Sequence, residues 1–122
     1  MIEFTVPGRP VPAVRMTRRS KWVDPQAQRH LEYKEFVGWI AKQAYKGEPL
    51  TGDVAVRFTF YLKPKGRRPD LSNLSKMIED ALNKIVWKDD VQVAHSEATR
   101  IFSESEPERV EVAVEEVEKG AS

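Results

Sequence analysis

The sequence predicts a single α+β domain in which two helices pack on one mixed β-sheet, with the elements in the order β-α-β-α-β-β. Apolar and polar residues alternate over residues 54–62, which is the period of a strand with one buried face. Apolar residues recur at helical spacing over residues 71–85 and predict an amphipathic helix. The 122 residues are enough for one core, and they contain neither a repeat nor a linker. We therefore expect one domain over residues 1–122.

A strand, a loop and a helix are predicted before the alternating segment. Apolar residues alternate with polar ones at positions 2–6, and a proline-stiffened turn follows at 7–12. Residues 15–22 are basic and lack apolar periodicity, which is typical of an exposed loop. Asp24 followed by Pro25 is a helix start. The apolar stripe of this helix, which Gly47 and Pro49 close, consists of Tyr33, Phe36, Val37, Ile40 and Ala44.

After the alternating strand, a basic turn at residues 63–68 leads into the amphipathic helix. Residues 91–102 and 108–117 are predicted to form two further strands with a polar turn between them. The last residues, 118–122, are expected to be a frayed tail. The predicted sheet therefore has four strands.

Composition excludes several classes of protein. The chain has no cysteine, which excludes disulfides, thiolate metal sites and a cysteine nucleophile. Its two histidines, His30 and His95, are too few for a typical zinc site. No apolar stretch is long enough to span a bilayer, and the first residues lack a basic start followed by an apolar signal core. We therefore expect a soluble, cytoplasmic protein without a membrane partner.

The net charge of +1 hides an uneven distribution of charge along the chain. Residues 1–76 hold 15 Lys and Arg against 7 Asp and Glu, whereas residues 77–122 hold 5 against 12, so the two parts carry +8 and −7. A basic part of this kind is what a polyphosphate partner would need, although ordinary surface charge also explains it.

The helix predicted over residues 71–85 has an apolar and a polar face. On a helical wheel with Asp70 at zero, the apolar residues fall between about 20° and 120°. The polar residues fall between about 240° and 320°. They are Asn73, Lys76, Asp80 and Lys84, with Asp70 at their edge. A solvated face with one weak Lys76/Asp80 pair is one interpretation, and the flanking sequence favours another.

Asp70 and Asp90 flank this helix. Asp70 stands at the start of the helix, directly after an Arg-Arg-Pro tripeptide, and Asp90 lies in the segment between the helix and the next strand. We expect the helix N-terminus and the strand start to meet, so that the two carboxylates come together. Phosphodiester hydrolysis needs a hard cation, and Mg²⁺ prefers a few carboxylates while keeping several waters. Lys76, about one and a half turns into the helix, would contact the scissile phosphate or the anionic transition state.

These residues resemble the pattern P-D-x-D-N-L-x-K, D-A-L-N, W-x-D-D-x-Q-V of the RusA family of Holliday-junction resolvases. The matching segments are Pro69–Lys76, Asp80–Asn83 and Trp87–Val93, and Val6–Pro12 also looks like the family's N-terminal strand and turn. The resemblance covers nearly the whole domain. It implies a mixed α/β fold, an intertwined homodimer, dependence on Mg²⁺ or Mn²⁺, and paired nicks across a four-way DNA junction in recombination and repair. Members of this family are common in phages and prophages.

Carried over residue by residue, the resemblance assigns roles to five positions. It implies that Asp70 and Asp90 bind the metal and that Lys76 is the catalytic-site lysine. It also implies that Asn73 and Asp80 orient or support the site.

Ser72 stands where the family pattern has a second aspartate, which removes a negative charge from the expected metal cluster. Its hydroxyl can bind Mg²⁺ directly or through water, and it can also cap the helix by accepting a backbone N–H bond. Asp89 beside Asp90 is a candidate for the missing charge. Glu79 is another, although a structural role suits it better. The departure leaves the number of metal ions and their affinity open.

Basic residues of the first loop and of the basic turn are candidates for contacts to phosphates on either side of the cleavage point. They are Arg15, Arg18, Arg19, Lys21, Lys63, Lys65, Arg67 and Arg68. Paired cuts need two active sites and one chain offers a single acidic cluster, so we expect a two-fold symmetric homodimer. Phe36, Trp39 and Tyr45 are candidate apolar contacts between its subunits.

Two other functions are compatible with the sequence. If Ser72 disables the metal site, the protein only binds branched DNA or single strands, and a metal titration separates this function from the enzyme. A scaffold protein with an acidic tail is the other alternative. It predicts no DNA affinity and leaves the arrangement of Asp70, Lys76 and Asp90 unexplained.

Overall fold

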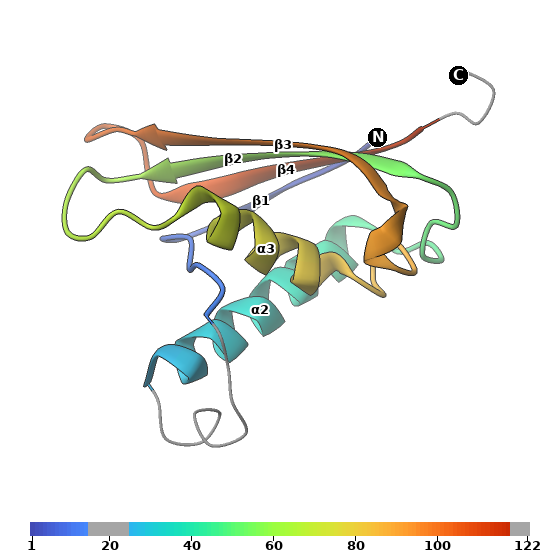
Figure 1. The fold of residues 1–122 in the computed structure, drawn as a ribbon, viewed down its shortest axis with the longest axis horizontal. Helices are drawn as coiled ribbons and strands as arrows, with labels where there is room; N and C mark the ends of the chain where they lie inside the picture. The colour runs from blue at the N-terminus through green and yellow to red at the C-terminus, as the bar shows by residue number, and fades with distance from the viewer. Residues whose placement is uncertain (15–24, 118–122) are drawn as a thin grey trace.

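The computed structural model describes residues 1–14 and 25–117, and it confirms the predicted order of strands and helices (Figure 1). The elements are β1 (Ile2–Pro7), α2 (Pro25–Ala44), β2 (Val54–Leu62), α3 (Leu71–Leu82), the short 3-10 helix η1 (Asp90–Gln92), β3 (Val93–Phe102) and β4 (Arg109–Glu116). The loop predicted at 15–22, the helix start at Asp24 and the tail at 118–122 lie outside the described residues.

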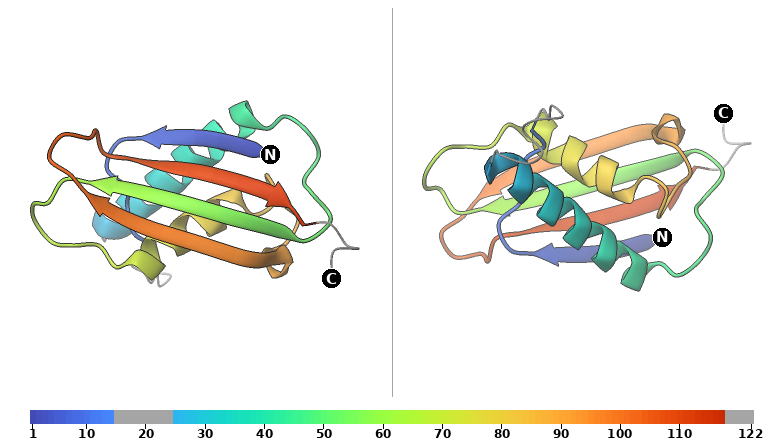
Figure 2. Two further views of the ribbon diagram at one scale, coloured as in Figure 1. Left: turned by 90° about the horizontal axis from the view of Figure 1, so that it is seen from above. Right: turned by 90° about the horizontal axis from the view of Figure 1, so that it is seen from below.

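The described strands form one mixed sheet in the order β1-β4-β2-β3, so the predicted α+β class is confirmed. β1 and β2 run antiparallel to β4, whereas β2 and β3 are parallel. Both helices cover the same face of the sheet, and the opposite face is left bare (Figure 2). The molecule therefore has two layers, with its core between them.

The core follows from the alternation in β2 and the helical spacing in α3. The five even-numbered residues of β2, from Val54 to Leu62, are at most 2% exposed. Leu74, Ile78 and Leu82 of α3 are fully buried against this layer. Each apolar side chain of this size contributes roughly 1.5–3 kcal/mol on burial, so the core holds α3 firmly on the sheet.

α3 ends three residues earlier than the spacing predicts, at Leu82. Lys84 adopts the left-handed conformation, with a φ of 74°. Its backbone N–H donates to the carbonyl of Trp87 at 2.7 Å, which closes a turn instead of extending the helix. Ile85 fits the apolar spacing of the helix, but it packs against the core from this turn.

The strand predicted from residue 91 begins at Val93, because η1 occupies the preceding residues. The side chain of Gln92 accepts a hydrogen bond from the backbone N–H of Asp89 at 2.8 Å. The same side chain, which is buried, donates to the carbonyls of Leu50 and Gly52 in the segment before β2. These bonds fix the connection between α3 and β3.

The proline-rich segment after β1 is tied to both helices. The chain turns at Gly8, whose φ of 94° lies in the left-handed region that glycine adopts without strain. The N–H of Ala13 donates to the carbonyl of Asn73 at 2.9 Å, and the N–H of Val14 donates to Nδ1 of His30 at 3.2 Å. Burial, and next a neighbouring lysine, lower the pKa of His30, which favours the neutral ring that this acceptor role requires.

α3 is the crossover between the parallel strands β2 and β3, so it runs antiparallel to both. Figure 1 shows the start of α3 below the carboxyl ends of these strands and η1 at their opposite ends. At the first end, Nη1 of Arg100 donates to the carbonyl of Pro69 at 2.7 Å. At the other end, Oγ of Ser96 lies 3.5 Å from Oε2 of Glu79. The two ends of α3 are therefore separate places in the fold.

Candidate active site

Asp70 is exposed at the beginning of α3. Its Oδ1 accepts hydrogen bonds from the hydroxyl of Ser72 at 2.7 Å and from the backbone N–H of Ser72 at 2.9 Å. The hydroxyl bond, and next the backbone bond, lower the pKa of Asp70 below its ordinary value. The carboxylate therefore stays ionised at neutral pH, as a metal ligand must.

The expectation that Ser72 caps the helix as an acceptor is wrong. Asp70 is the N-cap, with the extended backbone that a cap residue adopts, and Ser72 donates to it. The hydroxyl of Ser72 therefore orients a candidate ligand. Direct metal binding by Ser72 stays a prediction.

Asp90 is oriented by a buried indole. Nε1 of Trp87, whose side chain is fully buried, donates to Oδ1 of Asp90 at 2.9 Å. Asp89 instead caps η1, with its Oδ1 accepting from the N–H of Val91 at 3.2 Å. The structure thus gives the carboxylate of Asp89 a backbone partner, and a metal role for it stays a prediction.

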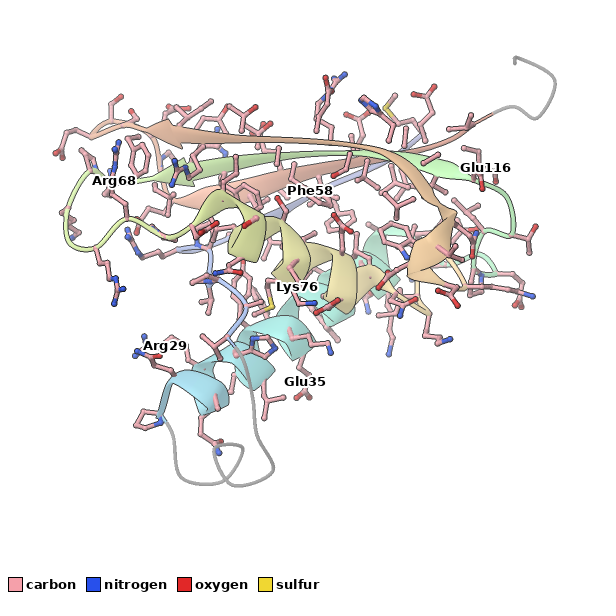
Figure 3. All side chains as sticks on the ribbon, viewed as in Figure 1. Arg29, Glu35, Phe58, Arg68, Lys76 and Glu116 are labelled. Atoms are coloured by element: carbon pink, nitrogen blue, oxygen red, sulfur yellow. The ribbon has the colours of Figure 1, made fainter. Side chains whose placement is uncertain are left out.

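Glu79 and Asp80 lie on the second half of α3, toward the end of the helix from which the chain continues to Asp90. Burial, and next the charge of Asp90, raise the pKa of Glu79 above its ordinary value, and Asp80 acts in the same direction. Nζ of Lys76 lies 3.9 Å from Oδ2 of Asp80. Because the Lys76 side chain is 66% exposed, this pair is worth only a few tenths of a kcal/mol and leaves the ammonium free to contact a phosphate. Figure 3 shows Lys76 midway along α3.

Asp70 and Asp90 do not meet within one chain, so that prediction is wrong. Asp90 acts on Glu79, which lies nine residues beyond Asp70, or roughly 13 Å at about 1.5 Å of helix per residue. Within residues 1–14 and 25–117, no three His, Asp or Glu side chains are grouped to hold one metal ion. The antiparallel course of α3 is the physical reason, because it carries the chain away from Asp70 before Asp90 is reached.

The basic turn before α3 lies at the same end as Asp70. Lys65, Arg67 and Arg68 are exposed there, as a DNA-contacting role requires. The guanidinium of Arg68 stacks over the ring of Phe102, 4.1 Å from its centroid. Four further candidates for DNA contacts lie outside the described residues, namely Arg15, Arg18, Arg19 and Lys21.

Sequence reasoning missed the contributions of Arg100 and Trp87. The charge of Arg100 helps to lower the pKa of Asp70, although the Ser72 hydroxyl is the main cause. No local signal points to Arg100, because it reaches the site from a strand 30 residues later in the chain. The short spacing of Trp87 and Asp90 is the only local sign of their hydrogen bond.

Among the described residues, every helix is too short or too polar to cross a bilayer.

Comparison with known proteins agrees with the motif. The uncharacterized protein YqaN of Bacillus subtilis (strain 168) is 32% identical over 142 aligned positions, which cover 95% of this chain and 96% of YqaN. A family model described as endodeoxyribonuclease RusA matches residues 7–115, from the end of β1 to β4. The chain therefore belongs to the RusA family of endodeoxyribonucleases.

Proposed function

We propose that this chain is a Mg²⁺-dependent endonuclease that acts in the cytoplasm and resolves four-way DNA junctions by paired nicks, with Mn²⁺ able to replace Mg²⁺. One observation carries the proposal: a hydrogen-bond donor holds each of the two carboxylates of the motif. Ser72 holds Asp70, and the buried Trp87 holds Asp90. The bond from Trp87 to Asp90 lies outside α3, so a merely solvated helix face does not account for it.

The candidate metal ligands are Asp70 and Asp90, and Glu79 lies close enough to Asp90 for the charge of Asp90 to help raise its pKa. Hard cations prefer oxygen ligands, and Mg²⁺ is often bound through only one or two carboxylates. Asp70 fits this preference because it is exposed and its hydrogen bonds keep it ionised. When bound, the cation would polarise the scissile phosphodiester and lower the pKa of the attacking water.

The basic residues would hold the phosphate backbone around the cut. Lys65, Arg67 and Arg68 lie at the Asp70 end and would bind phosphates beside it. Lys76 stands between the two ends of α3, where its ammonium would stabilise the negative charge of the transition state. Asn73, exposed in the first turn of α3, would orient the phosphate groups bound beside it.

We propose a two-fold homodimer that joins the separated carboxylates. A two-fold axis perpendicular to α3 reverses the helix in the second copy, so Asp70 of one protomer would face Asp90 of the other. Such a dimer has two complete sites, as paired nicking requires. Val91, 83% exposed beside Asp90, is an apolar side chain that this interface would cover. Phe36 and Trp39 of α2, 40% and 59% exposed, are further candidate contacts.

Incubation with a mobile four-way junction, with and without Mg²⁺, tests the proposed function. We expect symmetric nicks in two strands of like polarity when Mg²⁺ is present, and no nicks without it. Asp70→Asn and Asp90→Asn should abolish cutting and leave junction binding intact, because each removes a ligand while reducing negative charge near the phosphate. Glu97→Gln on the bare sheet face is the matched control and should cut at the wild-type rate. Binding without cutting at any metal concentration would favour a DNA-binding protein without nuclease activity.

A further inference from the structure

A cavity of about 900 Å³ opens beside Asp70. Its walls come from the proline-rich segment after β1, the first turns of α2 and the turn before α3. The polar lining that matters here consists of Arg9, Arg29, Arg67, Arg68, Asp70 and Asn73. The volume lies within the range of about 300–1,000 Å³ that is typical of ligand pockets.

The lining of the cavity favours an anion, because it contains four arginines and a single carboxylate. Arg9 forms an ion pair with Glu108, and Arg68 stacks on Phe102. Arg29 and Arg67 come from different walls and have no partner among the described residues. Figure 3 shows Arg29 on α2 and Arg68 on the turn at the same end of the molecule. Two uncommitted guanidinium groups on separate walls suit an anion with more than one phosphate.

One wall of the cavity is apolar and offers no free backbone donor at four of its positions. Pro10 and Pro12 have no N–H, and the N–H groups of Ala13 and Val14 are already used by Asn73 and His30. These four positions offer no backbone donor to a phosphate, but their apolar surface can pack against the flat face of a nucleobase. The combination of arginines and an apolar wall therefore matches the two parts of a nucleotide.

We infer that this cavity takes one unpaired nucleotide of a DNA strand, with its base on the proline-rich wall and its flanking phosphates on Arg29 and Arg67. The inference rests on the proposed function in placing that nucleotide next to the phosphate that is cut near Asp70. Asn73 lines the same cavity, so its amide is positioned to hydrogen-bond the base edge. Bases that are already unpaired cost least to take out of the stack, so the cavity would distinguish a substrate with unpaired nucleotides from an intact duplex.

Binding of a labelled oligothymidylate to the full chain, measured without metal, tests the phosphate contacts. Arg29→Ala should weaken binding at least about fivefold and lower the slope of log K against log salt by roughly 0.7, the value for one phosphate contact to a single strand. Arg29→Lys should keep most of that slope. Arg57→Ala is the matched control, because Arg57 is an exposed arginine on the bare sheet face. Equal weakening in both alanine variants would overturn the assignment of Arg29.

An abasic version of the oligonucleotide tests the base contact with the wild-type protein, independently of any variant. Removing the bases should cost roughly fivefold or more in affinity, because base stacking is lost. Equal affinity for the intact and the abasic strand would overturn the nucleotide pocket. A chain that binds the intact strand and cuts no junction contradicts only the proposed function. If the chain cuts junctions but its affinity for single strands depends on neither the bases nor Arg29, only this inference is contradicted.

Discussion

Asp70 and Asp90 show how neighbouring side chains orient the carboxylates of the proposed site. Each carboxylate is held by a neighbour within three residues, Ser72 in one case and Trp87 in the other. In the proposed site, both neighbours would influence metal binding through the carboxylate they hold, without touching the metal ion. Mutations at such positions should therefore change metal dependence before they change the fold.

Substitutions of Ser72 test this role. Ser72→Ala removes the hydroxyl bond and keeps the backbone bond, so the pKa of Asp70 should rise toward its ordinary value, as an NMR titration of the carboxyl would show. Ser72→Asp adds a second carboxylate beside Asp70 and should lower the Mg²⁺ concentration needed for cutting severalfold. A folded but inactive Ser72→Asp variant would mean that the site is adapted to serine.

His30 should make stability depend on pH. Its pKa in the folded chain is lowered from the ordinary value of 6.5, chiefly by burial, so the unfolded chain binds a proton more readily. Stability should therefore fall as pH drops from about 7 through the folded-state pKa. His30→Asn keeps an acceptor for the N–H of Val14 and does not titrate, so this part of the pH dependence should disappear in denaturant unfolding between pH 8 and pH 5. Parallel curves for the two proteins would contradict the assignment.

At the scale of elements, the end of α3 decides where the acidic residues lie. Lys84 interrupts the helix in a left-handed conformation, and the turn that follows leads to Trp87 and η1. A helix extended to Ile85 would rotate this connection and move Asp90. The turn therefore positions half of the candidate site.

Lys84→Gly tests the strain in this turn. Glycine adopts a positive φ without the clash of a Cβ, so the variant should gain about 0.5–1 kcal/mol in the free energy of unfolding. Lys84→Ala keeps the Cβ and should change the free energy of unfolding little. Urea titrations of the three proteins would measure both differences. A loss of stability in Lys84→Gly would show that the lysine side chain, and not the backbone, stabilises the turn.

At the scale of the whole molecule, the separation of Asp70 from Asp90 makes assembly part of the proposed mechanism. In the proposed dimer, each site combines the start of α3 from one subunit with the end of α3 from the other. The alternative is a site within one subunit at a single end of α3. The two arrangements predict different behaviour in mixed dimers.

Co-assembly of Asp70→Asn and Asp90→Asn subunits separates these arrangements. If the site is shared, each mixed dimer contains one site with both mutations and one with neither, so nicking of a single strand should return. If the site lies within one subunit, every site carries a mutation and mixing restores nothing. Sedimentation tests whether the subunits form a dimer, and a gel that resolves nicked from fully cut junctions measures the activity. Full resolution by a monomer would contradict both the dimer and the shared site.

The sequence by itself determined the fold class, the order of elements and the buried faces of β2 and α3, whereas Phe36 and Ala44 of the apolar stripe predicted for α2 are exposed. The features it determined depend on residues two, three or four positions apart, so the alternation in β2 and the spacing in α3 are enough to predict them. It also determined the family, because the motif is a run of neighbouring residues. Local patterns could not reveal the end of α3, since Ile85 keeps the apolar spacing after the helix has stopped.

The tertiary structure alone decided which polar residues meet. The parallel pairing of β2 with β3 sends α3 in the opposite direction, which separates Asp70 from Asp90 and brings Arg100 to the Asp70 end. The tertiary structure also brings together the arginine-lined cavity from three segments that are distant in the chain. Strand pairing is a long-range choice among many hydrogen-bonding partners, and no short window of sequence encodes it.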